Sequence, residues 1–220
     1  MTEIFEIEEI IDPRILPIET IGKLAALGRT EAIFMMAYTH YYGINEAEQN
    51  HQTSVAFARE GHKRGDVFCT AMFGRALWTG VGVAKDQRRG ERLCFSALPL
   101  LTQAGFTAPK FSLYARNLLG CIYLLNVARQ KTGLQLAMDA LRSALPLPAA
   151  QYHYAVCLQK ADRKKHESQI EELYCGAAEG GILQAQIYCN DRGLSFTDRN
   201  SAYDKRLQGR NLGLKINAVV

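Results

Sequence analysis

The sequence lacks the features that mark an exported, membrane-spanning or strongly charged protein. Its first twelve residues include five acidic ones, whereas a secretory signal needs a basic start and an unbroken apolar run. The longest apolar stretch, between Arg116 and Arg129, is broken by glycine and asparagine and falls short of the roughly 20 residues that span a bilayer. Basic residues exceed acidic ones by only four, a mild excess. We expect a soluble, cytoplasmic protein without a membrane span.

Two short basic clusters, at 85–92 and 160–165, do not change this expectation. Each cluster contains acidic residues as well, among them Asp86, Glu91 and Asp162. Mixed charge of this kind is typical of solvated helix ends. Nucleic-acid binding is an alternative reading of these clusters, but we do not expect nucleic acid as a partner.

Signatures of metal, nucleotide and nucleophile chemistry are also missing. The six cysteines include no CxxC pair and lie in apolar surroundings, which favours reduced, buried thiols over a disulfide framework. The five histidines form no HExxH motif, and no GxxxxGK[ST] phosphate loop occurs. We therefore expect no catalytic residue, no metal and no cofactor. A cysteine and a histidine brought together in space remain an alternative that local spacing does not test.

What the chain does contain is an internal repeat. With 48% hydrophobic residues over 220 positions, it can bury one core, and two distant segments, starting at Gly65 and Gly181, read alike. Both follow the frame of a helix-to-helix junction with small residues at the fourth and ninth positions after it. The same frame fits five junctions, at Gly28, Gly65, Gly105, Pro146 and Gly181.

Each junction is followed by the pattern of two helices. Apolar residues at the fourth, eighth and twelfth positions give the first helix one buried face. A glycine fifteen residues after the junction predicts a left-handed C-cap that ends this helix, at Gly43, Gly80 and Gly120. Second helices are predicted over 49–63, 86–104, 134–145 and 167–179, with Asp86 as an N-cap.

The segment MFGRALWTGVGVAKD carries a resemblance to the Sel-one-like repeat (SLR) family, which is related to tetratricopeptide repeats. It matches the family pattern of a Leu-Gly glycine, an aromatic residue, a Gly-x-Gly-Val turn, and a basic residue with Asp opening the next helix. A second match is AAEGGILQAQIYCN. The matching positions, to which the resemblance assigns structural roles in the repeat, are Gly43, Gly65, Gly74, Gly80, Gly82, Asp86, Ala177, Ala178, Gly181 and Ala185.

The resemblance implies an all-α protein, an α/α superhelical solenoid of about four helix pairs and a partial fifth. It covers 28–193, so we expect an N-terminal cap over 1–27 and a C-terminal cap or flexible basic tail over 194–220. Pro99, Pro109 and Pro146 depart from the family pattern, and proline within a helix predicts a local break or kink.

Solenoids of this kind usually line their concave surface with the first helix of each pair. Aromatic and arginine residues there are the anchors that protein interfaces favour. The candidate partner-binding residues are Phe34, Tyr38, Arg75, Phe111 and Tyr152. Of these, we expect Tyr38 and Arg75 to be the most exposed, while the alternative is that several of the five belong to the core between repeats.

Together these observations predict a non-catalytic scaffold or adaptor that holds a protein or peptide segment in its concave face. The resemblance adds bacterial roles, such as an effector, a secretion accessory or a toxin-immunity protein. The alternative is an enzyme or small-ligand-binding protein similar to the penicillin-interacting SLR relatives, although those carry cysteines paired at repeat junctions and the sequence indicates no such pairing.

Overall fold

Ten α-helices, and no strand, make up the part of the chain that the computed structural model describes, residues 16–45, 47–107, 111–127 and 132–197. The helices are α1 (Ile18–Ala26), α2 (Thr30–Tyr42), α3 (His51–Lys63), α4 (Val67–Thr79), α5 (Gln87–Thr107), α6 (Ser112–Leu125), α7 (Gly133–Arg142), α8 (Pro148–Asp162), α9 (Glu167–Glu179) and α10 (Leu183–Asp191).

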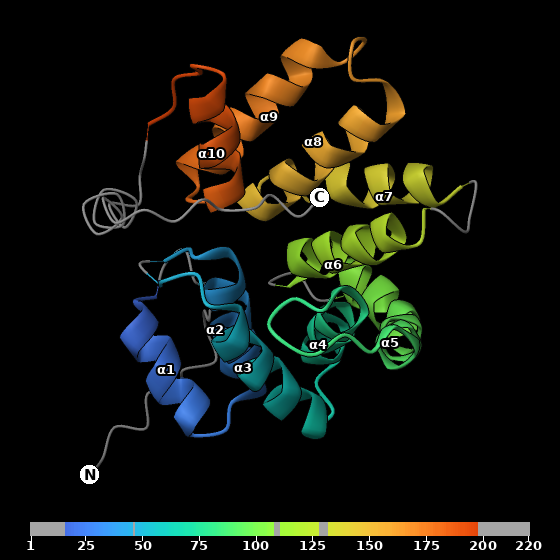
Figure 1. Cartoon of the computed structure of the whole chain (residues 1–220). Coiled ribbons are helices and arrows are strands. Elements are labelled where there is room, and N and C mark those ends of the chain that lie inside the picture. Colours follow the sequence, from blue (N-terminus) through green and yellow to red (C-terminus); the bar gives the residue numbers. More distant parts are fainter. Residues whose placement is uncertain (1–15, 46, 108–110, 128–131, 198–220) are drawn as a thin grey trace.

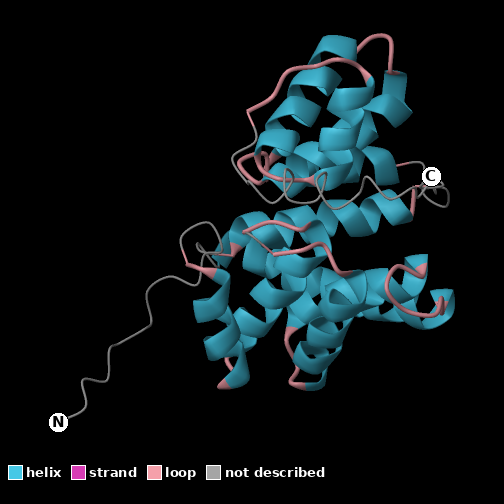
Figure 2. Ribbon diagram, turned by 60° about the vertical axis from the view of Figure 1, so that its left-hand side comes forward, coloured by secondary structure: helices cyan, strands magenta, loops and turns pink. Residues whose placement is uncertain are grey.

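Neighbouring helices pack as pairs, and the pairs stack (Figure 1). The pairs are α2–α3, α4–α5, α6–α7 and α8–α9, while α10 packs against α9 and α1 packs against α2. The first helices also contact one another, α2 with α4, α4 with α6 and α6 with α8. A second view shows the helices arranged in an upper and a lower group (Figure 2). The all-α class and the four helix pairs with a partial fifth are thereby confirmed.

Local signals at helix ends behave as the sequence predicts. Asp86 caps α5, because its Oδ1 accepts a hydrogen bond from the Arg89 amide at 3.0 Å. Gly43 and Gly80 end α2 and α4 in the left-handed conformation, with φ of 69° and 81°. These caps depend on a few adjacent residues, and a sequence motif therefore records them.

Two predicted helix ends are wrong, because packing overrides the local signal. Gly120 is not a C-cap but lies within α6, which continues to Leu125 and leaves the glycine facing Leu141 of α7. Gly105 likewise lies inside α5 rather than at a junction. The predicted break at Pro99 is also absent, since α5 runs through it. Proline removes its own amide donor and crowds a carbonyl of the preceding turn, but burial of Cys94, Ala97 and Leu101 in neighbouring turns holds the helix together.

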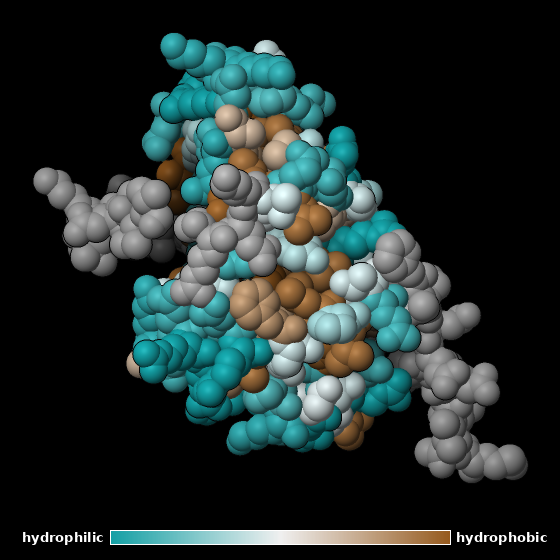
Figure 3. All heavy atoms as spheres, turned by 90° about the vertical axis from the view of Figure 1, so that its right-hand side faces the viewer, coloured by the Kyte–Doolittle hydropathy of each residue, from teal (hydrophilic) through white to brown (hydrophobic). Residues whose placement is uncertain are grey.

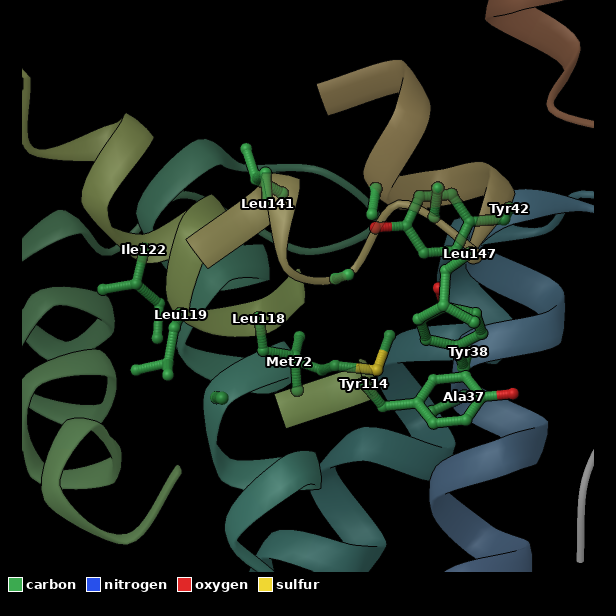
Figure 4. Packing of buried hydrophobic residues seen from close by; sticks show 14 of the residues in the cluster. Ala37, Tyr38, Tyr42, Met72, Tyr114, Leu118, Leu119, Ile122, Leu141 and Leu147 are labelled. Carbon is green, nitrogen blue, oxygen red and sulfur yellow. The ribbon is translucent and has the colours of Figure 1, made fainter. Parts of the chain in front are cut away.

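The core follows the line along which the helix pairs meet. Tyr38, Tyr42 and Tyr114 gather on the side of α2, and Leu118 and Leu141 lie farther along the same cluster (Figure 4). Several of the residues assigned structural roles contribute close contacts or buried small side chains. Ala177, Ala178 and Ala185 are fully buried, Gly65 and Gly181 have positive φ, and a side chain at Gly82 would collide with the His51 carbonyl.

The predicted caps are described only in part. The segment TIGKLAALG includes most of α1 and covers α2, as a half-unit would. Residues 1–15 and 198–220 lie outside the described residues, so the boundaries at 27 and 194 and the basic tail stay predictions.

Candidate functional site

The five candidate partner-binding residues divide into a buried group and a half-buried group. Phe34, Tyr38 and Arg75 are only 1%, 2% and 7% exposed, so the prediction that Tyr38 and Arg75 are exposed is wrong. Their helices lie side by side, and side chains that would line an open concave face fill the space between repeats instead. Phe111 and Tyr152 are half-buried and keep some exposed surface.

Arg75 lies where the inner helices converge. Its guanidinium sits over the ring of Tyr41, 5.2 Å from the centroid, and lies near the Tyr42 hydroxyl. The Tyr42 hydroxyl can donate to His153 Nε2, 3.0 Å away on α8. We call Arg75, Tyr41, Tyr42 and His153 the arginine cluster.

The positive charge in the arginine cluster, on the guanidinium of Arg75, has no carboxylate partner among the described residues. Within the described residues, none of the ion pairs involves Arg75. Burial, and to a lesser extent the nearby Arg75 charge, which would repel a second cation, together lower the pKa of His153 to about 3. His153 is therefore neutral at pH 7, which suits an acceptor for Tyr42.

A cysteine lies beside the arginine cluster, and a cysteine and a histidine brought together are the alternative that spacing alone left open. Cys121 is buried near Tyr42, whose hydroxyl is 3.0 Å from His153 Nε2. Burial raises the pKa of the Cys121 thiol, the largest effect on it, although Arg75 opposes that shift. A nucleophilic cysteine needs a lowered pKa and access to substrate. The arrangement is not typical of an activated nucleophile.

The cysteines are all free thiols, as the sequence predicts. One detail differs, because the structure brings two of them together across the Gly181 junction. The Sγ atoms of Cys175 on α9 and Cys189 on α10 are 3.8 Å apart. The sequence indicated no such pair, since fourteen positions separate the two residues and only the packing of α10 on α9 joins them.

The molecule is hollowed where α2 and α4 begin. A cavity of about 440 Å³ lies between these helix starts and α5. A smaller one of about 210 Å³ adjoins it and shares Thr30 and Asp66 with it. We call the two together the junction groove, and the smaller one the phenylalanine pocket. The phenylalanine pocket is lined by Thr30, Glu31, Phe34, Asp66, Phe68 and Phe111.

The structure thus brings together two of the five sequence candidates, Phe34 and Phe111, in the phenylalanine pocket. Sequence reasoning missed Glu31 and Phe68, which stand at the third position after their junctions. These positions in the repeat are a signal that the sequence contains. It becomes visible only when third and sixth positions of successive units are compared, because neighbouring first helices supply the pocket walls.

The described residues contain neither a metal-binding cluster nor a membrane-spanning helix. No group of three or more His, Cys, Asp or Glu side chains there is arranged to hold a metal ion. None of the helices there has the length and apolar character needed to cross a membrane.

Neither a protein-family model nor a curated protein matches the chain. The fold is an all-α helical repeat. Among solved structures, a Sel1 repeat protein from Oxalobacter formigenes is similar, with 16% identity, a TM-score of 0.41, and coverage of 89% of this chain and 77% of that one. A protective antigen of uropathogenic Escherichia coli, c5321, displays an SLR fold, with 19% identity, a TM-score of 0.34, and coverage of 82% and 45%.

Proposed function

We propose that the chain is a non-catalytic scaffold or adaptor that binds a segment of another protein. The observation that carries this proposal is the junction groove, where Leu100 is 54% exposed beside Val67 and Ala104. Apolar residues gathered in a hollow, as opposed to ones scattered singly over a surface, are typical of an interaction surface. Helical repeats commonly present such extended surfaces to partners.

The proposal also says where the partner binds. The arginine cluster fills the inner face between α2, α4 and α8, so the surface left for a partner lies at the helix starts rather than at Tyr38 and Arg75. Phe111, half-buried in the phenylalanine pocket, and Leu100 then serve as apolar anchors. Tyr152, half-buried on α8, stays a predicted contact outside the groove.

A finer proposal concerns the biological role. We propose a bacterial effector, a secretion accessory or a toxin-immunity protein, acting in the cytoplasm. The resemblance of the repeat motif to SLR proteins supports this proposal, and the junction groove is compatible with each of the three roles.

Affinity capture from cells of the source organism, followed by quantitative mass spectrometry, tests the scaffold. Three baits are compared, namely the wild type, Leu100→Asp and the matched control Leu136→Asp. Leu136 is also an exposed leucine on a second helix, 41% exposed on α7, but it lies outside the junction groove. Circular dichroism first establishes that all three baits are folded.

The expected result is a stoichiometric protein that is retained by the wild type and Leu136→Asp and lost from Leu100→Asp. If Leu100→Asp retains it as well, the groove is not the binding surface. If the wild type retains no stoichiometric protein, the scaffold proposal is wrong.

A further inference from the structure

We propose that the phenylalanine pocket is a binding site for a quaternary ammonium group. This inference does not depend on a protein partner, because it rests on the chemistry of the pocket walls alone. Three aromatic rings and two carboxylates line a small cavity, and they come from the starts of α2 and α4 and from the N-cap residues of α4 and α6.

The aromatic walls supply the first half of the recognition. The ring centroids of Phe34 and Phe68 are 5.0 Å apart, those of Phe68 and Phe111 are 5.6 Å apart, and the rings are tilted by 40° and 52°. Phe34 and Phe111 are 6.1 Å apart at 58°. Rings this close pack on one another, and Phe34 is only 1% exposed, so the ring surface open to the pocket comes from the half-buried Phe68 and Phe111. The faces of aromatic rings attract cations.

The negative charge of the Glu31 and Asp66 carboxylates is the second feature that favours a cation in the pocket. None of the residues that line the phenylalanine pocket is basic. Arg64 lines the adjoining cavity, where its Nε donates to Glu60 Oε1 at 2.9 Å, so its charge is already offset. The starts of α2 and α4 each contribute about half a positive charge, which leaves the two carboxylates with a net negative charge between them.

The carboxylates of Glu31 and Asp66 carry the same charge and repel each other. Burial raises the pKa of Asp66, and the negative charge of Glu31 raises it further, while the hydrogen bond from the Cys69 amide to Asp66 Oδ1 at 2.7 Å opposes the shift. A cation between the two acids would relieve their repulsion. Glu31 is exposed and forms no ion pair among the described residues.

The size of the pocket limits the ligand to a head group. A cavity of about 210 Å³ has the volume of roughly seven water molecules in the liquid, which is less than drug-sized pockets have. A primary ammonium is strongly hydrated and requires several hydrogen-bond acceptors once it leaves water. A quaternary ammonium donates no hydrogen bond, and its methyl groups can contact the phenylalanine rings directly.

The test is a chemical-shift titration of the full chain with choline and with 3,3-dimethylbutanol, which has a carbon atom in place of the charged nitrogen. We expect saturable binding of choline with a Kd in the millimolar range, as suits a fragment of this size. The neutral compound should bind about fivefold more weakly or not at all, because it lacks the cation–π attraction. Ethanolamine, whose ammonium carries no methyl group, should also bind more weakly.

Two variants locate the site. Phe68→Leu keeps an apolar side chain but removes the ring, and we expect it to weaken choline binding by about fivefold. Glu31→Gln changes an exposed residue, so it should leave the fold intact and weaken binding by about twofold to fivefold. Phe57→Leu on α3, outside the pocket, is the matched control and should bind as the wild type does.

Several results would overturn the proposal. Equal affinities for choline and its neutral counterpart would show an apolar pocket with no preference for charge. Unchanged choline binding in both Phe68→Leu and Glu31→Gln would place the site elsewhere. Absence of saturable choline binding up to about ten times the expected millimolar Kd would remove the site altogether.

Discussion

In the pair α4–α5 two helix backbones approach each other through glycines, whereas in the pair α6–α7 a glycine faces a leucine side chain. A Cβ atom added to Gly90 would lie 2.4 Å from the Trp78 nitrogen and 2.6 Å from the Gly74 carbonyl oxygen. One added to Gly120 would lie 2.4 Å from Cγ of Leu141. The first contact has backbone on both sides, and the second has a side chain that can shift.

This difference explains why one unit matches the repeat motif and the other does not. Where backbone meets backbone, only glycine fits without a shift of the helices. Where a glycine meets a side chain, the two residues can change together while the helices still pack. The pair α4–α5 therefore carries a recognisable motif, and α6–α7 keeps the same arrangement without one.

The largest effect is expected from a substitution that disrupts the backbone contact between α4 and α5. Gly90→Ala should lower the free energy of unfolding by about 3 kcal/mol, because the added methyl group collides with the backbone of α4. Urea denaturation followed by circular dichroism measures it. An effect below about 1 kcal/mol would show that α4 and α5 can separate easily, and would contradict the backbone contact.

Acidic pH should lower the free energy of unfolding through His153 of the arginine cluster, where no glycine is involved. The unfolded His153 has a pKa near 6.5 and the folded one about 3, so the unfolded chain binds the extra proton. Stability is therefore unaffected above about pH 6.5 and falls as the pH drops below it. Because His153 retains some exposed surface, we expect a loss of about 1–2 kcal/mol at pH 5.

His153→Gln is the control for this pH effect. Its amide oxygen can still accept from Tyr42 but does not titrate in this range. Unfolding free energies of both proteins between pH 7 and pH 5 should diverge, with the wild type losing more. Parallel curves would mean that His153 is not held neutral in the folded protein.

A smaller effect is expected at the side-chain contact. Gly120→Ala should cost about 1–2 kcal/mol, less than Gly90→Ala, since the Leu141 side chain can move. Combining it with Leu141→Ala should cost less than the sum of the two single changes, because the methyl group then fills space that the leucine left. Denaturation of the four proteins in this cycle gives the coupling. Strict additivity would contradict direct contact.

The smallest expected effect concerns the N-caps of the two second helices, α5 and α7. Asp86→Ala should cost about 1 kcal/mol, because the Asp86 side chain caps α5. Thr132→Ala should have almost no effect, since the Thr132 side chain makes no capping hydrogen bond at the start of α7. Equal losses in thermal or urea denaturation would show that capping does not distinguish the pairs.

The sequence predicts the features that short segments determine. Gly80 and Asp86 were identifiable because a C-cap and an N-cap each need only a few adjacent residues. Gly120 and Pro99 misled, because contacts with another helix decided the outcome there. The same reason hid the site. Periodicity marks the apolar face of one helix, but it does not show that Arg75 and Tyr38 would be covered by neighbouring helices, or that Phe34 and Phe111 would meet Glu31 and Phe68.

The hydrogen bond between Tyr42 and His153 joins residues 111 positions apart, and Gln184 Nε2 reaches Gln49 Oε1 at 3.4 Å across 135 positions. In an open repeat array each unit touches only its neighbours, so the ends can fray independently. Here side-chain hydrogen bonds also link the first unit to the fourth and to α10. We expect such a molecule to unfold in one cooperative transition and to fold more slowly than an open array of equal length, because distant segments must meet first.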